Sequence, residues 1–263
     1  MIFALDLVLF QSANALVGRS FTLDALMALA LDSAVLKGGP IAACFMFAWW
    51  HGAPGQRQSD NRRTLLLTLC ALFVVAPVMK IVSTTVPISP RPLVAAEHIF
   101  VLKDGAMVAS GITDFRVPAT GLAADLSHKA AEGTIAGNDL ASFPSDHAAL
   151  FAAFAGGIFL ALRAAGLAAS IWAILGIFLP RVATGLHWPS DIIAGALAGL
   201  VILAIVLAAG RSLLDRQFTW LVALAERHPA WSQAIIVLVL FEAAGAMTTL
   251  SRFVELAKGV TGI

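Results

Sequence analysis

The chain has 263 residues, of which 59% are hydrophobic and 13% are charged, and its mean hydropathy is +0.88. This composition lies outside the range of soluble globular domains and predicts an integral membrane protein made mostly of apolar segments. The formal net charge of +1 provides no large basic surface, so nucleic acid is not expected as a partner.

The amino-terminal residues 1–17 lack a basic leading segment and place Asp6, Gln11 and Asn14 among apolar side chains. This pattern predicts an amphipathic helix at the membrane interface and argues against a cleaved signal peptide. Residues 22–33 are also apolar, but Gly38-Gly39-Pro40 follows closely. A bent or re-entrant entry is therefore expected before the first membrane crossing.

Six apolar segments are long enough to be predicted as membrane spans. They cover residues 34–50, 64–86, 145–163, 167–184, 191–210 and 232–251. The predicted fold class is all-α, a polytopic membrane helical bundle that forms one membrane-embedded domain over residues 1–263. Cys44 and Cys70 lie inside apolar runs and are expected to pack as small side chains rather than to form a disulfide. No particular oligomeric state is predicted.

The basic residues of the connecting loops predict the orientation of the bundle. Loops rich in Arg and Lys face the cytoplasm, which applies here to the loops that contain Arg57, Arg62, Arg63, Arg163, Arg211, Arg216 and Arg227. The opposite side then carries the long segment 87–143 and both termini.

Segment 87–143 is the only substantial stretch outside the predicted spans. A hairpin is expected around Lys103-Asp104-Gly105 and an amphipathic helix near 118–131. A connection of this length is often functional. The segment is expected to act either as a lid over a site or as a packed cap without chemistry, while His98 and His128 within it are expected to be ordinary solvated or packed side chains.

Ionisable residues cluster at the outer ends of the predicted spans. Lys80 and Arg91-Pro92 follow the second span, the run 142–147 opens the third, and the run 181–191 joins the fourth to the fifth. Charged groups beside membrane helices are costly to bury, so their convergence on one membrane face predicts a shared polar site.

The types of these residues indicate an anionic ligand. Pro144 at a helix start leaves Ser145 and the following amides free to bind a phosphate oxygen. Arg91 and Arg181 can add forked hydrogen bonds to the same group. Two histidines, with Asp191 four residues after His187, could supply a nucleophile and a general acid for phosphoryl transfer.

These motifs resemble those of the type 2 phosphatidic acid phosphatase superfamily, which includes lipid phosphatases and vanadium haloperoxidases. Pro144-Ser145-Asp146-His147 matches the family's Pro-Ser-x-His motif. Arg181, His187 and Asp191 reproduce the spacing of its last motif. The resemblance covers about residues 8–210, without segment 93–140.

The resemblance implies a role for each matching residue. His187 would be the nucleophile that forms a phosphohistidine, Asp191 would orient it, and His147 would protonate the leaving group. The phosphate-binding residues would be Lys80, Arg91, Pro144, Ser145, Asp146 and Arg181. The family needs neither a metal ion nor another cofactor, and no acidic cluster suited to Mg²⁺ is evident.

Two positions depart from the usual family pattern. Ten residues separate Lys80 from Arg91, and the family's usual spacing falls instead on Thr84, one helical turn away on the same face. Asp146 replaces a common Gly, and this variant is similar to undecaprenyl pyrophosphate phosphatases of the bacitracin-resistance type, as is the stretch from Phe10 to Met27. A first-turn acid that stabilises the helix dipole is the simpler interpretation of Asp146.

The favoured function is therefore metal-independent hydrolysis of undecaprenyl pyrophosphate, a lipid of the bilayer. The expected location is a bacterial inner membrane, with the site on the periplasmic side. Phosphatidic acid, phosphatidylglycerol phosphate and a lipid A phosphate are alternative substrates. A transporter for an anionic substrate is the alternative of another class. The location of the polar residues at one face instead of the midplane argues against it.

Overall fold

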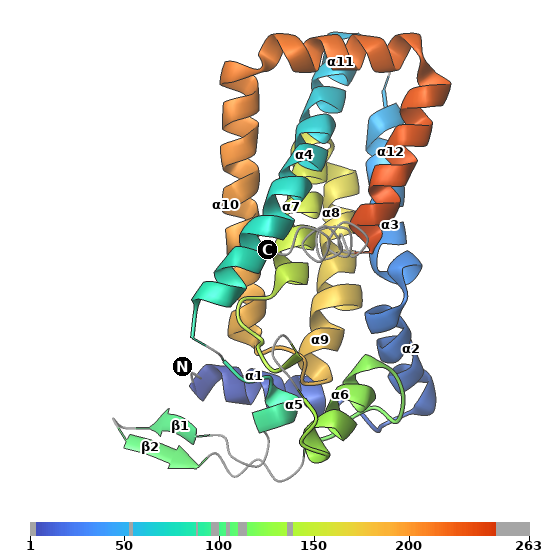
Figure 1. Ribbon diagram of the computed structural model, residues 1–263. Helices are drawn as coiled ribbons and strands as arrows, with labels where there is room; N and C mark the ends of the chain where they lie inside the picture. Colours follow the sequence, from blue (N-terminus) through green and yellow to red (C-terminus); the bar gives the residue numbers. More distant parts are fainter. Residues whose placement is uncertain are drawn as a thin grey trace, which may run out of the picture. The chain divides into compact units, whose positions relative to one another are not determined.

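The computed structural model describes residues 4–52, 55–87, 89–95, 100–103, 106–109, 115–135 and 139–245. It is helical apart from one short hairpin (Figure 1). The prediction of an all-α fold is therefore confirmed.

Each of the six apolar segments predicted to span the membrane contains a helix. These helices are α3 (Ala34–Trp50), α4 (Gln56–Thr85), α7 (Asp146–Ala161), α8 (Arg163–Trp172) with its continuation, α10 (Pro189–Leu213) and α12 (Pro229–Ala244). The continuation of α8 is a π-helical turn, η2 (Ala173–Phe178), followed by α9 (Leu179–Ala183).

Three helical segments of the described chain are long and apolar enough to cross a membrane, namely α4, residues 163–183 and α10. Helix α2 (Phe21–Asp32) forms a bent pair with α3 that qualifies as a fourth, in agreement with the predicted bent entry. Helices α7 and α12 have 16 residues each, which corresponds to about 24 Å. The chain is a membrane protein, and the count of six spans stays a prediction.

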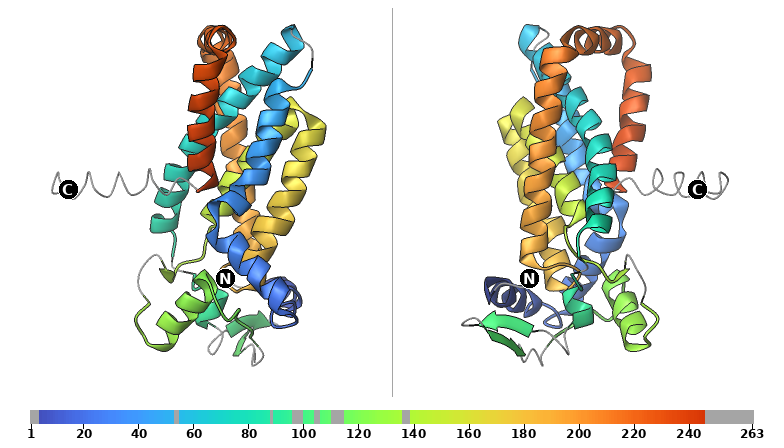
Figure 2. Two further views of the ribbon diagram at one scale, coloured as in Figure 1. Left: turned by 90° about the vertical axis from the view of Figure 1, so that its right-hand side faces the viewer. Right: turned by 60° about the vertical axis from the view of Figure 1, so that its left-hand side comes forward.

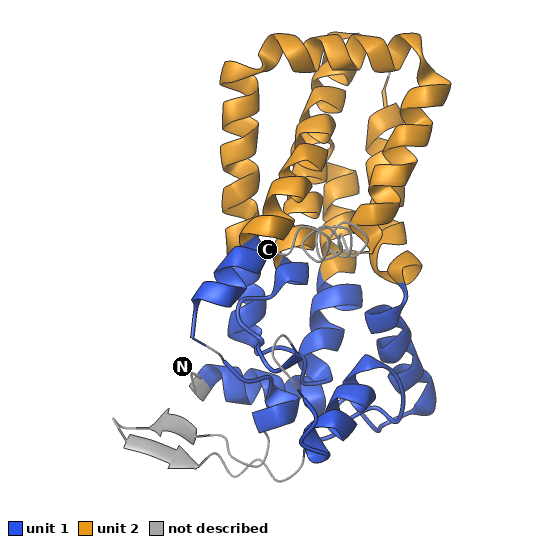
Figure 3. Ribbon diagram, viewed as in Figure 1, with its two compact units in different colours: residues 1–33, 79–148, 174–196 blue, residues 34–78, 149–173, 197–263 orange. Residues whose placement is uncertain are grey.

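The chain divides into two compact units, each built from separate stretches of sequence (Figure 3). Unit 1 comprises residues 1–33, 79–148 and 174–196, and unit 2 comprises residues 34–78, 149–173 and 197–263. Every residue predicted to form the site belongs to unit 1. The predicted single domain over 1–263 stays a prediction.

In unit 2, helix α3 packs against both α8 and α12. The indole nitrogen of Trp172 donates hydrogen bonds to the carbonyl oxygens of Leu36 and Lys37. A Cβ atom built on Gly38 would lie 2.3 Å from the Cα of Ala244. Small residues thus let the backbones approach closely, as is usual between membrane helices.

The connection between the fifth and sixth predicted spans is a helix, α11 (Asp215–Arg227), where the sequence analysis assigned only a loop. Helix α11 runs across between the ends of α10 and α12 (Figures 1 and 2). Phe218 and Val222, four residues apart, are buried on one face. Asp215 forms an ion pair with Arg63 of α4. The helix forms because it can bury an apolar face and pair its acids with the basic start of α4.

A cluster around Arg62 joins α3, α4 and α11 within unit 2. The guanidinium lies 5.5 and 5.1 Å from the ring centroids of Trp49 and Trp50. It is also 2.9 Å from a carboxylate oxygen of Glu226, and its Nε donates to the Trp49 carbonyl. The Arg62 side chain is 8% exposed. The Glu226 side chain is 40% exposed, so removing the guanidinium would break an ion pair that is buried on the arginine side only.

We predict that Arg62→Ala lowers the free energy of unfolding by about 1 to 2 kcal/mol, because it breaks a partly exposed ion pair and two cation–π contacts. Thermal melting of the purified protein in detergent measures the loss. Arg57→Ala is the matched control, since Arg57 is exposed on the same helix. Equal melting temperatures for the two variants would show that the cluster does not stabilise the fold.

Unit 1 contains the amino-terminal and loop elements that surround the site. Helix α1 (Ala4–Asn14) packs on α9, and α2 packs on α9 and on α6 (Leu122–Ala131). Helix α5 (Pro92–Ala95) also contacts α6. The predicted hairpin is present as antiparallel strands β1 (Phe100–Lys103) and β2 (Ala106–Ala109), while its turn and His98 lie outside the described residues.

Candidate active site

His187 lies in the short loop 184–188 between α9 and α10. The backbone N–H groups of Leu186 and His187 both donate to the carbonyl of Arg181. Gly185 has a φ of +75°, and a Cβ there would lie 2.7 Å from the ring of Phe115. Only glycine therefore fits this turn without strain. The loop is folded tightly onto the end of α9, which fixes where His187 leaves the backbone.

The Nδ1 atom of His187 lies 2.9 Å from the carbonyl oxygen of Ser142. A carboxylate oxygen of Asp191 is 3.8 Å from the same nitrogen. The residue spacing predicted that Asp191 would hold this nitrogen, whereas the nearest acceptor is a main-chain carbonyl. An Nδ1–H group that donates to it leaves Nε2 as the unprotonated nitrogen of a neutral imidazole.

Asp191 is 1% exposed and organises the loop as well as the histidine. Its carboxylate accepts a hydrogen bond of 2.8 Å from the backbone N–H of Trp188. Its own carbonyl accepts a bond of 3.2 Å from the N–H of Ser145. Asp191 thus connects the start of α10 to the start of α7 and closes the turn beside His187.

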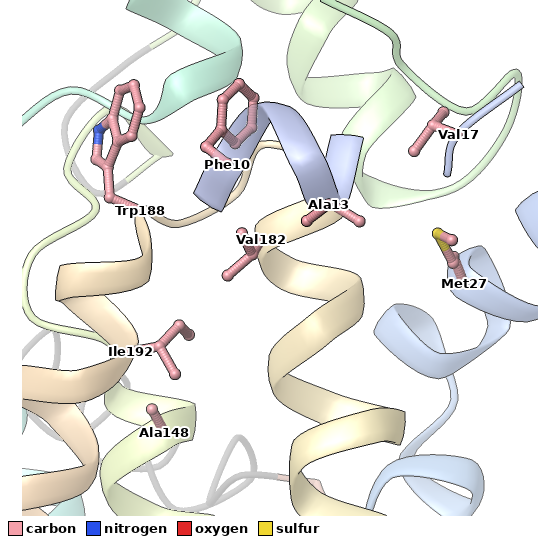
Figure 4. Close-up of a cluster of buried hydrophobic side chains, with 9 residues drawn as sticks. Phe10, Ala13, Val17, Met27, Ala148, Val182, Trp188 and Ile192 are labelled. Carbon is pink, nitrogen blue, oxygen red and sulfur yellow. The ribbon is translucent and has the colours of Figure 1, made fainter. Parts of the chain in front are cut away.

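Trp188 belongs to an apolar cluster beneath the site (Figure 4). The Trp188 side chain is 1% exposed. Its ring packs edge to face on Phe10 of α1, and its indole N–H donates to the carbonyl of Pro90. Trp188 is therefore a buried support of the loop, held between α1 and the segment before Arg91.

Two polar side chains of α1, Asp6 and Asn14, are buried and contact the elements that carry the site, whereas Gln11 is exposed. The Asp6 carboxylate accepts from the backbone N–H of Ser190 at 2.8 Å. The Asn14 amide donates to the carbonyls of Ala183 and Arg116. Leu5, Val8 and Leu9 are exposed instead. A helix is present where the amphipathic helix was predicted, and Asp6 and Asn14 tie it to the residues on either side of loop 184–188. Its place at the membrane interface stays a prediction.

Two arginines come together near His187. Arg91 donates from its guanidinium to the carbonyls of Leu186 and Asp139. Arg181 is 4% exposed and donates to the carbonyl of Ile177. The two guanidinium groups repel one another electrostatically, and Asp146 attracts both.

Burial lowers the pKa of Arg91 below its ordinary value of 12.5, opposed by the nearby carboxylates of Asp146, Asp139 and Asp191. Two close arginine cations favour an anion. The structure thus places Arg91 and Arg181 near one another, and their role in holding a phosphate stays a prediction.

The start of α7 carries the second histidine. The side-chain oxygen of Ser145 accepts from the N–H of Ala148 at 3.3 Å and acts as an N-terminal cap. Pro144 and Ser145 are buried, whereas Asp146 is exposed. The Asp146 carboxylate lies 2.8 Å from the Nδ1 atom of His147. The predicted Pro-Ser-x-His cluster therefore lies at a helix start, and the Asp146 carboxylate contacts the His147 ring.

Lys80 is the one predicted site residue for which the structure gives no supporting contact. It is exposed on α4. Within the described part of the chain, no ion pair or hydrogen bond of its ammonium group is recorded. Its predicted role in holding phosphate stays a prediction.

The residues described here form no group of three or more His, Cys, Asp or Glu side chains suited to a metal ion. The polar groups of the site are instead two arginines, two histidines and two acids. This set fits an anion held by guanidinium groups and attacked by an imidazole nitrogen.

The helical fold and this site define an integral-membrane protein with an anion-binding pair of arginines and two histidines. The chain belongs to the PAP2 superfamily, whose family model matches residues 63–213, more than half of the chain. The match includes every predicted site residue. Phosphatases are members of this superfamily, which supports hydrolysis of phosphate esters by this chain, with lipid phosphates as the suggested substrates. No curated protein and no solved structure gave a match.

Proposed function

We propose that the protein is a metal-independent lipid phosphatase that uses a phosphohistidine intermediate. The observation that carries the proposal is the contact of 2.9 Å between His187 Nδ1 and the Ser142 carbonyl. It supports a neutral imidazole whose Nε2 is free to attack phosphorus. Arg91 and Arg181 hold the phosphate, and Asp191 positions the loop that carries His187.

The reaction proceeds in two steps in this proposal. His187 Nε2 forms a bond to the terminal phosphorus while the bond from phosphorus to the leaving oxygen breaks and His147 gives that oxygen a proton. In the second step His147 takes a proton from water, whose oxygen displaces the imidazole and forms inorganic phosphate. The arginine cations stabilise the charge that builds on the phosphoryl oxygens in both steps.

We infer that the substrate is undecaprenyl pyrophosphate, with undecaprenyl phosphate as the product. The Pro-Ser-Asp-His motif and the stretch from Phe10 to Met27 support this choice through their similarity to the bacitracin-resistance type. The bacterial inner membrane is the proposed location, with the site on the periplasmic side, because the basic loops are expected to face the cytoplasm.

Phosphate release from the purified protein in detergent with EDTA tests this function. Undecaprenyl pyrophosphate, phosphatidic acid, phosphatidylglycerol phosphate and a lipid A phosphate are compared at equal mole fraction. The highest kcat/KM is expected for undecaprenyl pyrophosphate. A higher value for another lipid would overturn the substrate but keep the reaction, whereas no release from any lipid would favour a transporter of anions.

The pH dependence of the reaction follows from the environment of His187. Burial lowers the pKa of His187 below its ordinary value of 6.5, Arg91 lowers it further, and Asp191 opposes the change. The imidazole is neutral above its pKa and cannot attack when it is protonated below it. We therefore predict that the acidic limb of kcat/KM lies below pH 6.5.

The acidic limb is measured from the dependence of kcat/KM on pH between about pH 4 and 8. This dependence gives the pKa of the essential base in the free enzyme. The substrate phosphate titrates in the same range, so its protonation is followed separately by ³¹P NMR and corrected for. An acidic limb above pH 6.5 after this correction would show that His187 is not held as a buried neutral base.

A further inference from the structure

The start of α7 places a carboxylate directly against the second histidine of the site. Asp146 Oδ1 lies 2.8 Å from the Nδ1 atom of His147 and accepts a bond of 2.7 Å from the His147 backbone N–H. The Asp146 side chain is 68% exposed and that of His147 is 23% exposed. The carboxylate thus turns back to its neighbour although open space is available to it.

Neither of the two simpler roles of Asp146 explains this contact. The sequence analysis grouped Asp146 with the phosphate-binding residues, but a carboxylate repels a phosphate oxygen. A first-turn acid does interact favourably with the helix dipole. That effect needs only a negative charge near the helix start, and it requires no contact with the imidazole ring.

An acceptor at Nδ1 determines what His147 can do. The Nδ1–H group donates to the carboxylate, so the other ring nitrogen, Nε2, is the one presented to a substrate. The negative charge also favours the imidazolium form, which is the form that a general acid needs. Second-layer carboxylates orient and tune histidines in this way in other protein sites.

We propose that Asp146 is a positioning residue that acts through His147. It fixes the ring tautomer of His147 and stabilises its protonated form, and it does not bind phosphate. This inference rests on the proposed function, in which His147 protonates the leaving oxygen. It assigns to the Pro-Ser-Asp-His variant a general acid that stays protonated to higher pH than a glycine at position 146 would allow.

The charges around the pair explain why an acid is useful at this position. Arg91 and Arg181 both interact favourably with the Asp146 carboxylate. The same cations would disfavour a positive imidazolium nearby. The negative charge of Asp146 offsets these cations at the His147 ring, which must carry a proton to act as the general acid. The other titratable groups that face this region are His187, Asp139 and Asp191.

The test compares two leaving groups in wild type, Asp146→Asn and Asp146→Gly. Dioctanoyl phosphatidic acid releases an alkoxide that needs a proton, whereas 4-nitrophenyl phosphate releases a stable phenolate that does not. In both variants kcat/KM for phosphatidic acid is expected to fall about 10-fold or more, and that for 4-nitrophenyl phosphate by less than about 3-fold. The alkaline limb of the phosphatidic acid profile moves to lower pH.

A structural role for Asp146 would reduce both rates equally. Asp125→Asn is the matched control, because Asp125 is an exposed first-turn acid of α6. It should leave the ratio of the two rates unchanged. In ¹⁵N NMR of ring-labelled protein, wild-type His147 is expected to carry its proton on Nδ1 when neutral, and Asp146→Gly should lose this preference.

The outcomes separate the two levels of inference. If wild type hydrolyses both compounds and the variants keep the wild-type rate ratio, Asp146 has no positioning role while the phosphatase function stands. If wild type hydrolyses neither compound nor any lipid phosphate, the proposed function fails and this inference fails with it. A selective loss on phosphatidic acid together with the change in ¹⁵N signals supports the pairing.

Discussion

Replacing His187 by Ala should reduce phosphate release by a factor on the order of 10⁴ to 10⁶, because it removes the atom that forms the covalent intermediate. The effect is expected to be on kcat, since the arginines that hold the phosphate remain in place. Buried His187 is 6% exposed and lies in a loop fixed by main-chain bonds. The fold should therefore survive the substitution.

Acid-labile, alkali-stable labelling of the protein by ³²P-labelled substrate measures the intermediate directly. Wild type should become labelled on rapid quenching, and His187→Ala should not. His128→Ala is the control, because His128 is exposed on α6. Labelling that persists in His187→Ala, or activity within about 10-fold of wild type, would place the nucleophile elsewhere.

The members of the site could be predicted from sequence where local geometry decides the outcome. Arg181, His187 and Asp191 lie within eleven positions of one another, and the end of one helix followed by the start of the next brings them together. Arg91 is distant in sequence, and it was predicted from the position of its charge beyond the outer end of the second predicted span. The structure places it against Leu186 of the same loop.

The groups that hold the site were missed for a different reason. The acceptor for His187 is the main-chain carbonyl of Ser142, and a carbonyl carries no residue-type signal. Asn14 reaches the carbonyl of Ala183 across 169 positions of sequence. The polar residues of α1 were visible as an amphipathic pattern. The pattern does not tell whether they face water or a neighbouring helix, because both environments satisfy hydrogen bonds.

Helix α11 was missed although its signal was present. Phe218 and Val222 are spaced by four, and Glu226 follows by another four on the same side. The arginines of this segment were used only to assign the loop to the cytoplasm. The helix is stabilised by Arg62 and Arg63 of α4, which form ion pairs with Glu226 and Asp215 of α11. These pairs join residues far apart in sequence, so they are known only from the structure.

Glycine at position 195 sets the distance between the starts of α7 and α10, and Gly195→Ala should reduce kcat/KM by about 100-fold, because a displacement of about 1 Å is enough for such a loss. A Cβ there would lie 2.2 Å from the carbonyl oxygen of Ser145 and 3.2 Å from the Cβ of Ala148. The helices must separate to admit it. Ser145 and His147 then move away from Asp191, whose carbonyl accepts from the Ser145 N–H.

The same separation should lower the free energy of unfolding by about 1 to 3 kcal/mol, as overpacking usually does. Gly39→Ala is the matched control, because the nearest atom to a Cβ at that position is 3.6 Å away, an ordinary contact distance. It adds the same methyl group to another apolar helix and should keep full activity. If Gly195→Ala also kept full activity, the close approach of the two helices would not be what aligns the histidines. The opposite result is a fall in kcat that is larger than the fraction of unfolded protein, judged from the melting temperature, can explain. It would show that the glycine positions the site, because misaligned but folded protein still binds substrate through Arg91 and Arg181.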